Sequence, residues 1–435
     1  MNISVILPVL VTGTGIFFIF ELGGFFILHP GRVLKRLRGA LSDSAGFRAF
    51  SLALAGTLGV GNIFGVAAGI IIGGAGSVLW LFVSSVFAMV IKYAETALAT
   101  DNATDGHGGM HMVLRSVFPR VGRVLSVIYA ALCLVLALFM GFCMQSSSVV
   151  TVAQIAIGIP ASLGALLLVI LLIPGVVGGG GKIEKFTAFT IPLTTIIYII
   201  MTFAVILVNL SELPRAICEI VSSAASPMAA GGGLLSFLSS TALREGYSRG
   251  ILSNEAGAGT SAMAHTRASD RAPAVAGLYG MCEVFFDTLL LCTLTALAIL
   301  TAVPNYDSYR SPMALVSDAF TLSLGDFAGI LLFICIFLFA YSTIVCWYYY
   351  GSECAAYLFG ARVRAAFFLA FIFFVSLGAL GELGVTLAVT DGALLLMSVI
   401  TLLTLVRCSD RIRALTDSEG LIPRRRGTEK GGKHT

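Results

Sequence analysis

Charge is what this sequence has least of. Lysine, arginine, aspartate and glutamate together make up 11% of the 435 residues, whereas soluble domains carry about 25%. So few charged side chains cannot cover the surface of a water-soluble protein of this length. The hydrophobic fraction of 57% also excludes intrinsic disorder, because disordered chains are poor in apolar residues. The composition predicts an integral membrane protein in contact with the lipid bilayer, and the net charge of +4 does not indicate a nucleic acid partner.

Motifs for metal, disulfide and protease chemistry are missing as well. The nine cysteines form no C-x-x-C pair, and most lie in apolar runs, where a free cysteine behaves as a small apolar side chain. No H-E-x-x-H motif occurs. We therefore expect no cofactor, no structural metal and no enzymatic activity.

Long apolar runs are what the sequence has instead. About 20 apolar residues in a helix cross the roughly 30 Å hydrocarbon core of a bilayer. Eleven such segments are expected, at 4–28, 47–72, 77–98, 122–150, 161–177, 187–208, 233–262, 273–301, 326–350, 364–380 and 384–406. The first begins with no Lys or Arg before it, so we expect a membrane span rather than a cleaved signal.

The basic residues predict the orientation of these segments. Of the 27 Lys and Arg residues, 23 are assigned to connections on one side, with Lys92 counted among them, and two to the opposite side. By the positive-inside rule, the N-terminus lies outside and the basic tail 407–435 is cytoplasmic. The expected location is the plasma membrane.

The eleven segments divide into one helix and two sets of five. After the extra helix 4–28, residues of about 47–208 and 233–406 form two five-helix units of opposite orientation within one transmembrane domain, 1–406. Each unit opens with a glycine-interrupted helix, and such helices at matching places of two inverted halves mark the binding site of secondary transporters. The predicted fold is an all-α polytopic membrane protein with a 5+5 inverted repeat.

The first interrupted helix contains Gly56, Thr57 and Gly59, which favour local unwinding. Unwound backbone at membrane depth is tolerated only where other groups satisfy it. A bound carboxylate and a bound cation would do so. The alternative is close helix packing along glycines spaced four apart, which accounts for the glycines from position 65 onward.

The second interrupted helix carries charges inside the membrane. Arg244, Glu245, Arg249 and Glu255 fall in the segment 233–262. An unpaired charge at the bilayer centre costs about 2.5–3.5 kcal/mol. We therefore expect these side chains to pair with each other or to face a cavity.

Several segments resemble the alanine or glycine:cation symporter family, also called sodium:alanine symporters. They occur in family order and cover most of the chain between 50 and 360. The matching segments are GTLGVGNIFGVAAGI (56–70), GGAGSVLW (73–80), KYAETALA (92–99), MQSSS (144–148), RGILSNEAGAGTSAMAH (249–265), FFDTLLLCTLTALAIL (285–300) and YSTIVCWYYYGSECAAYLFG (341–360). The resemblance implies the leucine-transporter-type fold with an extra N-terminal helix, and sodium-driven uptake of a small neutral amino acid such as alanine or glycine.

The resemblance also implies a set of site residues. The positions that match the family's substrate site are Thr57, Gly59, Gly61, Gln145, Leu252, Thr343 and Trp347. Those that match its sodium site are the hydroxyls of Ser342 and Thr343 and the backbone carbonyls near Ala55, Leu58 and Phe339. Leu252 departs from the family pattern, which has phenylalanine there, and a smaller wall would admit a larger substrate.

Two other functions remain open from the sequence. A proton-coupled transporter would need a titratable group at the site, for which Glu21 and Asp287 are candidates. A non-transporting amino acid sensor on the same scaffold would bind the ligand without moving it. We interpret Glu95 and Asp287 as paired structural acids, and His265 as an incidental residue of a cytoplasmic segment.

Overall fold

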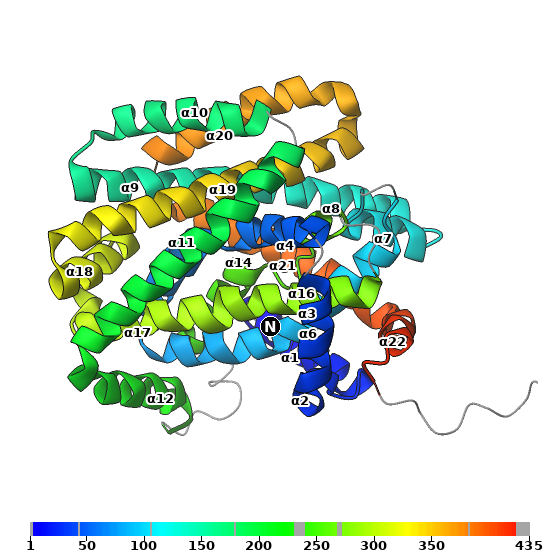
Figure 1. Cartoon of the computed structure of the whole chain (residues 1–435), viewed down its shortest axis with the longest axis horizontal. Coiled ribbons are helices and arrows are strands. Elements are labelled where there is room, and N and C mark those ends of the chain that lie inside the picture. Colours follow the sequence, from blue (N-terminus) through cyan, green and yellow to red (C-terminus); the bar gives the residue numbers. More distant parts are fainter. Residues whose placement is uncertain are drawn as a thin grey trace, which may run out of the picture.

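The computed structural model describes residues 3–41, 44–104, 107–177, 180–229, 240–267, 272–381 and 383–422. Within these ranges the chain is almost entirely helical, and one isolated bridge joins Thr104 and His107. Figure 1 shows most long helices lying side by side, with α11 crossing the others diagonally. The α-helices are α1 (Ile3–Glu21), α2 (Phe25–Leu28), α3 (Pro30–Leu41), α4 (Ser44–Thr57), α5 (Val66–Gly73), α6 (Gly76–Asp101), α7 (Met110–Val117), α8 (Gly122–Leu136), α9 (Gln145–Ile157), α10 (Ala161–Val177), α11 (Gly180–Val208), α12 (Leu213–Ala229), α14 (Thr241–Asn254), α15 (Ala262–His265), α16 (Pro273–Val284), α17 (Thr293–Ala302), α18 (Pro312–Leu324), α19 (Asp326–Phe359), α20 (Arg364–Leu380), α21 (Leu383–Arg407) and α22 (Ser409–Ser418).

Many of these helices are suited to a membrane. Among the described residues, seven helical segments are long and apolar enough to cross a bilayer: 76–101, 122–157, 185–208, 273–302, 326–359, 361–380 and 384–407. A bent pair, 46–57 and 61–73, makes an eighth if it is one span, and three shorter apolar helices are Ile6–Glu21, Ala161–Val177 and Pro312–Leu324. Large apolar side chains such as Leu166 of α10 and Phe189 of α11 are more than half exposed, as a lipid-facing surface requires.

The first interruption lies where the glycines predict it. Helix α4 ends at Thr57, and the chain resumes as a π-helical turn, η1 (Gly61–Gly65), that continues into α5. The two halves meet at 44°. Regular helical hydrogen bonding lapses here, because the Gly59 amide bonds to the Thr57 carbonyl two residues back. We refer to residues 58–60 as the first break.

The second interruption follows α14. Glu255 has a left-handed backbone (φ 54°), and Gly257 and Gly259 also have positive φ. A single helical turn, α15, comes next and ends at His265. We call residues 255–261 the second break; all seven are buried. The predicted segment 233–262 begins outside the described residues, which resume at 240, and positions 423–435 of the predicted tail lie outside them as well.

Glycines let helices approach α6 closely. A Cβ on Gly246 of α14 would lie 2.5 Å from the Trp80 Cβ, and one on Gly280 of α16 would lie 2.5 Å from the Thr96 Oγ1. Both distances are shorter than real contacts, so no larger residue fits without movement. Small residues at such crossings are typical of membrane helices. Helix α6 thus packs closely against both α14 and α16.

Candidate functional site

Side chains of α9 and α19 hold the first break. Gln145, at the start of α9, accepts a hydrogen bond from the Val60 backbone N–H through Oε1 at 3.0 Å. Thr343 of α19 donates its hydroxyl to the Ala55 carbonyl at 2.8 Å. Gln145 is 2% exposed and Thr343 1% exposed, so both bonds lie away from water. The structure thus brings two predicted substrate residues onto the backbone of the broken helix.

Trp347 belongs to the same centre. Its indole Nε1–H donates to the Gly56 carbonyl at 3.3 Å, and the side chain is fully buried. Glycine at position 59 is needed for this arrangement. A Cβ there would lie 2.7 Å from the Thr343 Oγ1 and 3.1 Å from the Gln145 Oε1. The first break therefore has no room for a side chain that points toward these two residues.

The other predicted substrate positions lie around this centre. The Thr57 hydroxyl is 3.4 Å from the Ala53 carbonyl of its own helix. A Cβ on Gly61 would lie 3.6 Å from the Leu252 carbonyl oxygen, and one on Gly65 would lie 3.6 Å from the Leu252 Cδ2. Leu252 thus packs against the second half of the first broken helix, just beyond the first break.

The predicted sodium ligands are all buried. The Ser342 hydroxyl has no hydrogen-bond partner among the described residues, although its side chain is fully enclosed. The neighbouring Thr343 hydroxyl is directed at the Ala55 carbonyl. Leu58 and Phe339 are at most 2% exposed. Within the described part of this site, the Ser342 hydroxyl is therefore a buried oxygen without a partner, and the hydroxyl of the next residue, Thr343, faces the broken helix.

A second polar cluster, absent from the predicted site, joins the two broken helices. Asp287 lies in a π-helical stretch, η4 (Phe285–Cys292), that follows α16. Its carboxylate accepts from the Asn62 amide at 2.5 Å, from the Ser253 hydroxyl at 2.6 Å and from the Thr288 hydroxyl at 2.7 Å. Ser253 also donates to the Asn62 Oδ1 at 3.0 Å. An aspartate in an apolar run was the sequence signal, but its two partners on other helices could not be read from it.

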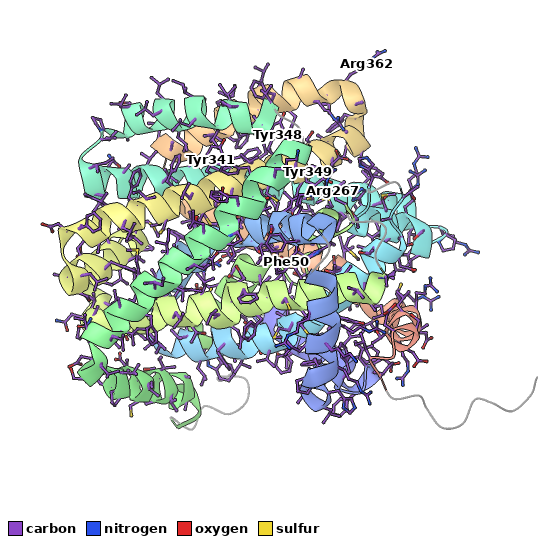
Figure 2. All side chains as sticks on the ribbon, viewed as in Figure 1. Phe50, Arg267, Tyr341, Tyr348, Tyr349 and Arg362 are labelled. Carbon is purple, nitrogen blue, oxygen red and sulfur yellow. The ribbon has the colours of Figure 1, made fainter. Side chains whose placement is uncertain are left out.

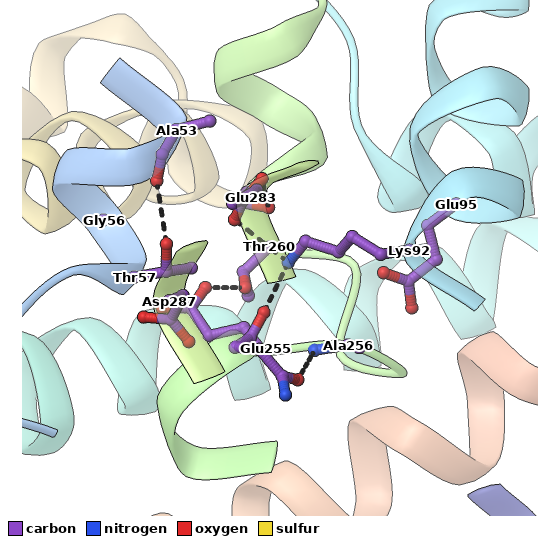
Figure 3. Close-up of polar contacts among 12 residues, drawn as sticks. Ala53, Gly56, Thr57, Lys92, Glu95, Glu255, Ala256, Thr260, Glu283 and Asp287 are labelled. Carbon is purple, nitrogen blue, oxygen red and sulfur yellow. Dashed lines mark hydrogen bonds and ion pairs between the residues drawn. The ribbon is translucent and has the colours of Figure 1, made fainter. Parts of the chain in front are cut away.

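A third cluster surrounds the second break (Figure 3). Lys92 of α6 forms an ion pair with Glu283 of α16 at 3.3 Å and donates to the Asn254 carbonyl at 2.7 Å. His265 lies 2.8 Å from the other Glu283 oxygen. The expectation that His265 is incidental was wrong, because it is 3% exposed and pairs inside the protein. The count of Lys92 among the loop cations was wrong too, since Lys92 is fully buried within α6.

Of the four charged residues expected in the second broken helix, Arg249 and Glu245 pair with each other. Arg249 of α14 lies 3.0 Å from Glu245, one turn earlier, and 3.2 Å from Asp391 of α21. The Arg249 side chain is 4% exposed and that of Asp391 is 35% exposed. This ion pair ties α14 to α21. The carboxylate of Glu255, in contrast, accepts from the Thr260 hydroxyl within the second break.

A cavity of about 460 Å³ opens beside α19. Its lining includes Arg267, Tyr348, Tyr349, Glu353 and Arg364. Figure 2 shows Arg267 next to Tyr349, and the guanidinium lies 5.4 Å from the centre of that ring. The lining residues of α19, from Tyr348 to Glu353, directly follow Trp347 in sequence.

Known proteins resemble this chain in sequence and in fold. A sodium/alanine symporter, AgcS, of Methanococcus maripaludis is 31% identical over 418 residues, which cover 91% of each chain. A putative sodium/proton-dependent alanine carrier, YrbD, of Bacillus subtilis is 30% identical over 376 residues, 82% of this chain and 77% of the relative. The crystal structure of MhsT in complex with L-phenylalanine matches with a TM-score of 0.58 at 16% identity, over 87% of this chain and 89% of that one.

These comparisons define the class of the protein. Its fold, in which two broken helices lie among apolar helices, is similar to that of MhsT. The profile of the sodium:alanine symporter family matches residues 1–418. The chain belongs to this family and is an amino acid:cation symporter.

Proposed function

We propose that this protein is a sodium-coupled symporter that imports a small neutral amino acid, alanine or glycine or one slightly larger, across the plasma membrane. The convergence of Gln145, Thr343 and Trp347 on the backbone of residues 55–60 carries the proposal. The Val60 N–H, now bonded to Gln145, is a donor that a substrate carboxylate can take over. The Gln145 amide then turns to the substrate.

Sodium is the proposed coupling ion. As a hard cation it takes oxygen ligands, by the same chemistry that governs calcium and magnesium sites. The free Ser342 hydroxyl, the Thr343 hydroxyl and the carbonyls of Ala55, Leu58 and Phe339 would supply them. One sodium ion moving inward gains about 2.3 kcal/mol per 100 mV. At tenfold per 1.4 kcal/mol, that gradient concentrates a neutral solute roughly 40-fold.

The proposed architecture is eleven spans in a 5+5 inverted repeat with an extra N-terminal helix. Seven long spans, the bent pair, the shorter helices at 6–21 and 161–177, and the polar α14–α15 segment together support this number. We place the N-terminus outside and the C-terminal tail in the cytoplasm. Because Lys92 is buried, it no longer counts among the 23 basic residues assigned to the cytoplasmic side, but the remaining excess of basic residues still favours the same orientation. Alternating access then occurs as the helices rock around the two breaks.

Proton coupling is the closest alternative. Asp287 favours it, since this buried carboxylate contacts both broken helices. A relative with 30% identity is described as sodium/proton-dependent. Glu21, the other candidate, pairs instead with Arg413 of α22 at 3.2 Å, at the end of α1. The sensor alternative predicts alanine binding without uptake.

Uptake into proteoliposomes tests the function. Labelled alanine should accumulate under an inward sodium gradient and should not accumulate under a proton gradient in sodium-free buffer. The Gln145→Ala variant leaves a buried partner unpaired at a cost of about 1–3 kcal/mol. Alanine affinity should therefore fall roughly 5- to 150-fold, at tenfold per 1.4 kcal/mol.

The control is Gln154→Ala, an exposed glutamine of the same helix α9, which should transport like the wild type. Unchanged alanine affinity in folded Gln145→Ala protein would remove Gln145 from the site. Binding without any uptake in the wild type would favour the sensor.

A further inference from the structure

The cluster around the second break contains more acid than base. Lys92, Glu95, Glu255 and Glu283 are all fully buried. One ammonium therefore faces three carboxyl groups within the protein. A group of buried charges that do not balance is costly, and such a group takes up protons or another cation instead of staying charged.

The ammonium of Lys92 is committed to one of the three acids. It lies 3.3 Å from Glu283 and bonds the Asn254 carbonyl. Glu283 receives further support from His265 at 2.8 Å and from the Ser261 hydroxyl at 3.3 Å. Glu283 thus has the surroundings of an ionised carboxylate. The other two acids have no ion pair among the described residues.

Glu95 and Glu255 are instead half-satisfied by the second break. One Glu95 oxygen accepts from the Gly257 backbone N–H at 2.6 Å, and one Glu255 oxygen accepts from the Thr260 hydroxyl. The remaining oxygens, Glu95 Oε2 and Glu255 Oε1, are buried and have no hydrogen-bond partner among the described residues. A proton on either oxygen would remove a buried charge at a place where no described group compensates it.

The charged groups that act on Glu95 or Glu255 are Lys92 of α6, Glu283 of α16 and Asp287 of η4, so Lys92 is the one cation among them in the described part of the chain. The remaining ionisable base of the cluster, His265 of α15, is bonded to Glu283. Tyr129 and Cys133 of α8 and Cys346 and Tyr350 of α19 lie nearby and are neutral in their ordinary form. No three His, Cys, Asp or Glu residues of the described chain could hold a metal ion together. A proton on each of Glu95 and Glu255 would remove this surplus of negative charge.

We propose that Glu95 and Glu255 form a proton-binding site that controls the second break. Each carboxylate takes up one proton (H⁺) from the surrounding solution when the break is open and holds it as a neutral acid when the break is closed. Ionisation would place two like charges beside the Gly257 and Thr260 contacts and favour hydration of the break. The proposal rests on the transport function only for its effect on substrate movement, because proton binding itself needs no substrate.

Infrared spectroscopy of the purified protein tests proton binding directly. At neutral pH without alanine, the wild type should show the carbonyl stretch of protonated carboxylic acids. Glu95→Gln and Glu255→Gln should each remove part of that band. The matched control is Glu353→Gln, since Glu353 pairs with Arg364 near the surface and should not contribute. If the glutamine variants do not fold, Glu95→Asp and Glu255→Asp should shift the band instead of removing it.

Alanine exchange at varied internal pH tests the effect on transport. The wild-type rate should change by up to about tenfold per pH unit for each proton that titrates, and the double glutamine variant should have a flat profile. The absence of a protonated band in the wild type, or a band unaltered by both substitutions, would overturn the proposal even if alanine is transported. A band that vanishes on adding sodium at constant pH would assign the site to sodium and overturn it too. If the wild type shows the band but does not transport alanine, the proposed substrate is contradicted and the proton-binding site is supported.

Discussion

Replacing Gly59 by alanine is the most direct test of the first break. The added Cβ would lie 2.7 Å from the Thr343 hydroxyl and 3.1 Å from the Gln145 amide oxygen, where ordinary contacts need more than 3.4 Å. Both partners are buried and hydrogen-bonded, so they cannot move without losing the bonds to Ala55 and Val60. Overpacking of this kind costs about 1–3 kcal/mol.

The cost falls on the geometry that we propose binds the substrate. Alanine affinity should therefore drop about 5- to 150-fold, by the rule of tenfold per 1.4 kcal/mol. The assay is binding of labelled alanine to purified protein, with thermal unfolding measured in parallel to confirm folding. Gly65→Ala is the control, because its Cβ would meet only the Leu252 Cδ2 at 3.6 Å and the Arg249 Cδ at 4.0 Å, and it should bind alanine like the wild type. Equal affinities for the two folded variants would refute the reasoning.

Three further outcomes are expected. Ser342→Ala removes the free buried hydroxyl and should raise the sodium concentration for half-maximal uptake. The control is Ser148→Ala, because the Ser148 hydroxyl bonds the Met144 carbonyl one turn earlier, and this variant should need the same sodium concentration as the wild type. Equal sodium dependence of the two variants would exclude Ser342 as a ligand. Leu252→Phe should narrow the substrate range toward alanine and glycine, since one methylene in an apolar pocket is worth about 1–3 kcal/mol. Identical inhibition by 2-aminobutyrate and valine in both proteins would show that residue 252 does not face the substrate. Asp391→Asn should lower the free energy of unfolding, and with it the unfolding midpoint; the loss should be less than the about 3–5 kcal/mol of a fully buried pair, because Asp391 is 35% exposed. Arg411→Gln, which breaks the exposed pair with Asp101, should lower the unfolding midpoint less than Asp391→Asn does. A larger loss for Arg411→Gln would contradict the conclusion that the Arg249–Asp391 pair ties α14 to α21.

The sequence predicts the breaks well because their causes are local. Gly56 and Gly59 lie within four residues of each other, and glycine weakens a helix wherever it stands. The predicted interruption of the first helix is confirmed by the structure. In the second, Gly257 and Gly259 take positive φ, which suits glycine, but Glu255 takes it as well. No propensity identifies a glutamate for that conformation, and its partner Thr260 becomes visible only in three dimensions.

Pairing across long sequence separations explains what the sequence could not predict. Lys92 and Glu283 are 191 positions apart, and nothing in either segment selects the other. Counting Lys92 as a loop residue followed from its charge alone, whereas burial beside Glu283 and Asn254 supplies the compensation that keeps it inside α6. The prediction of Gln145, Thr343 and Trp347 came from the family resemblance. Their spacing along the chain would not have predicted that all three side chains contact the same broken helix.

The three polar centres form one connected system across both broken helices. Gln145 bonds the first break at Val60, two residues before Asn62. Asn62 in turn bonds Asp287 of η4 and Ser253, which lies at the end of α14. Asn254, the next residue, presents its carbonyl to Lys92. Adjacent residues thus give a continuous chain of contacts between the two breaks. The second break carries two carboxyl oxygens that have no partner among the described residues. We therefore expect substrate binding at the first break to alter the proton binding that we propose for Glu95 and Glu255, and alanine added at constant pH should change the infrared band of the protonated acids.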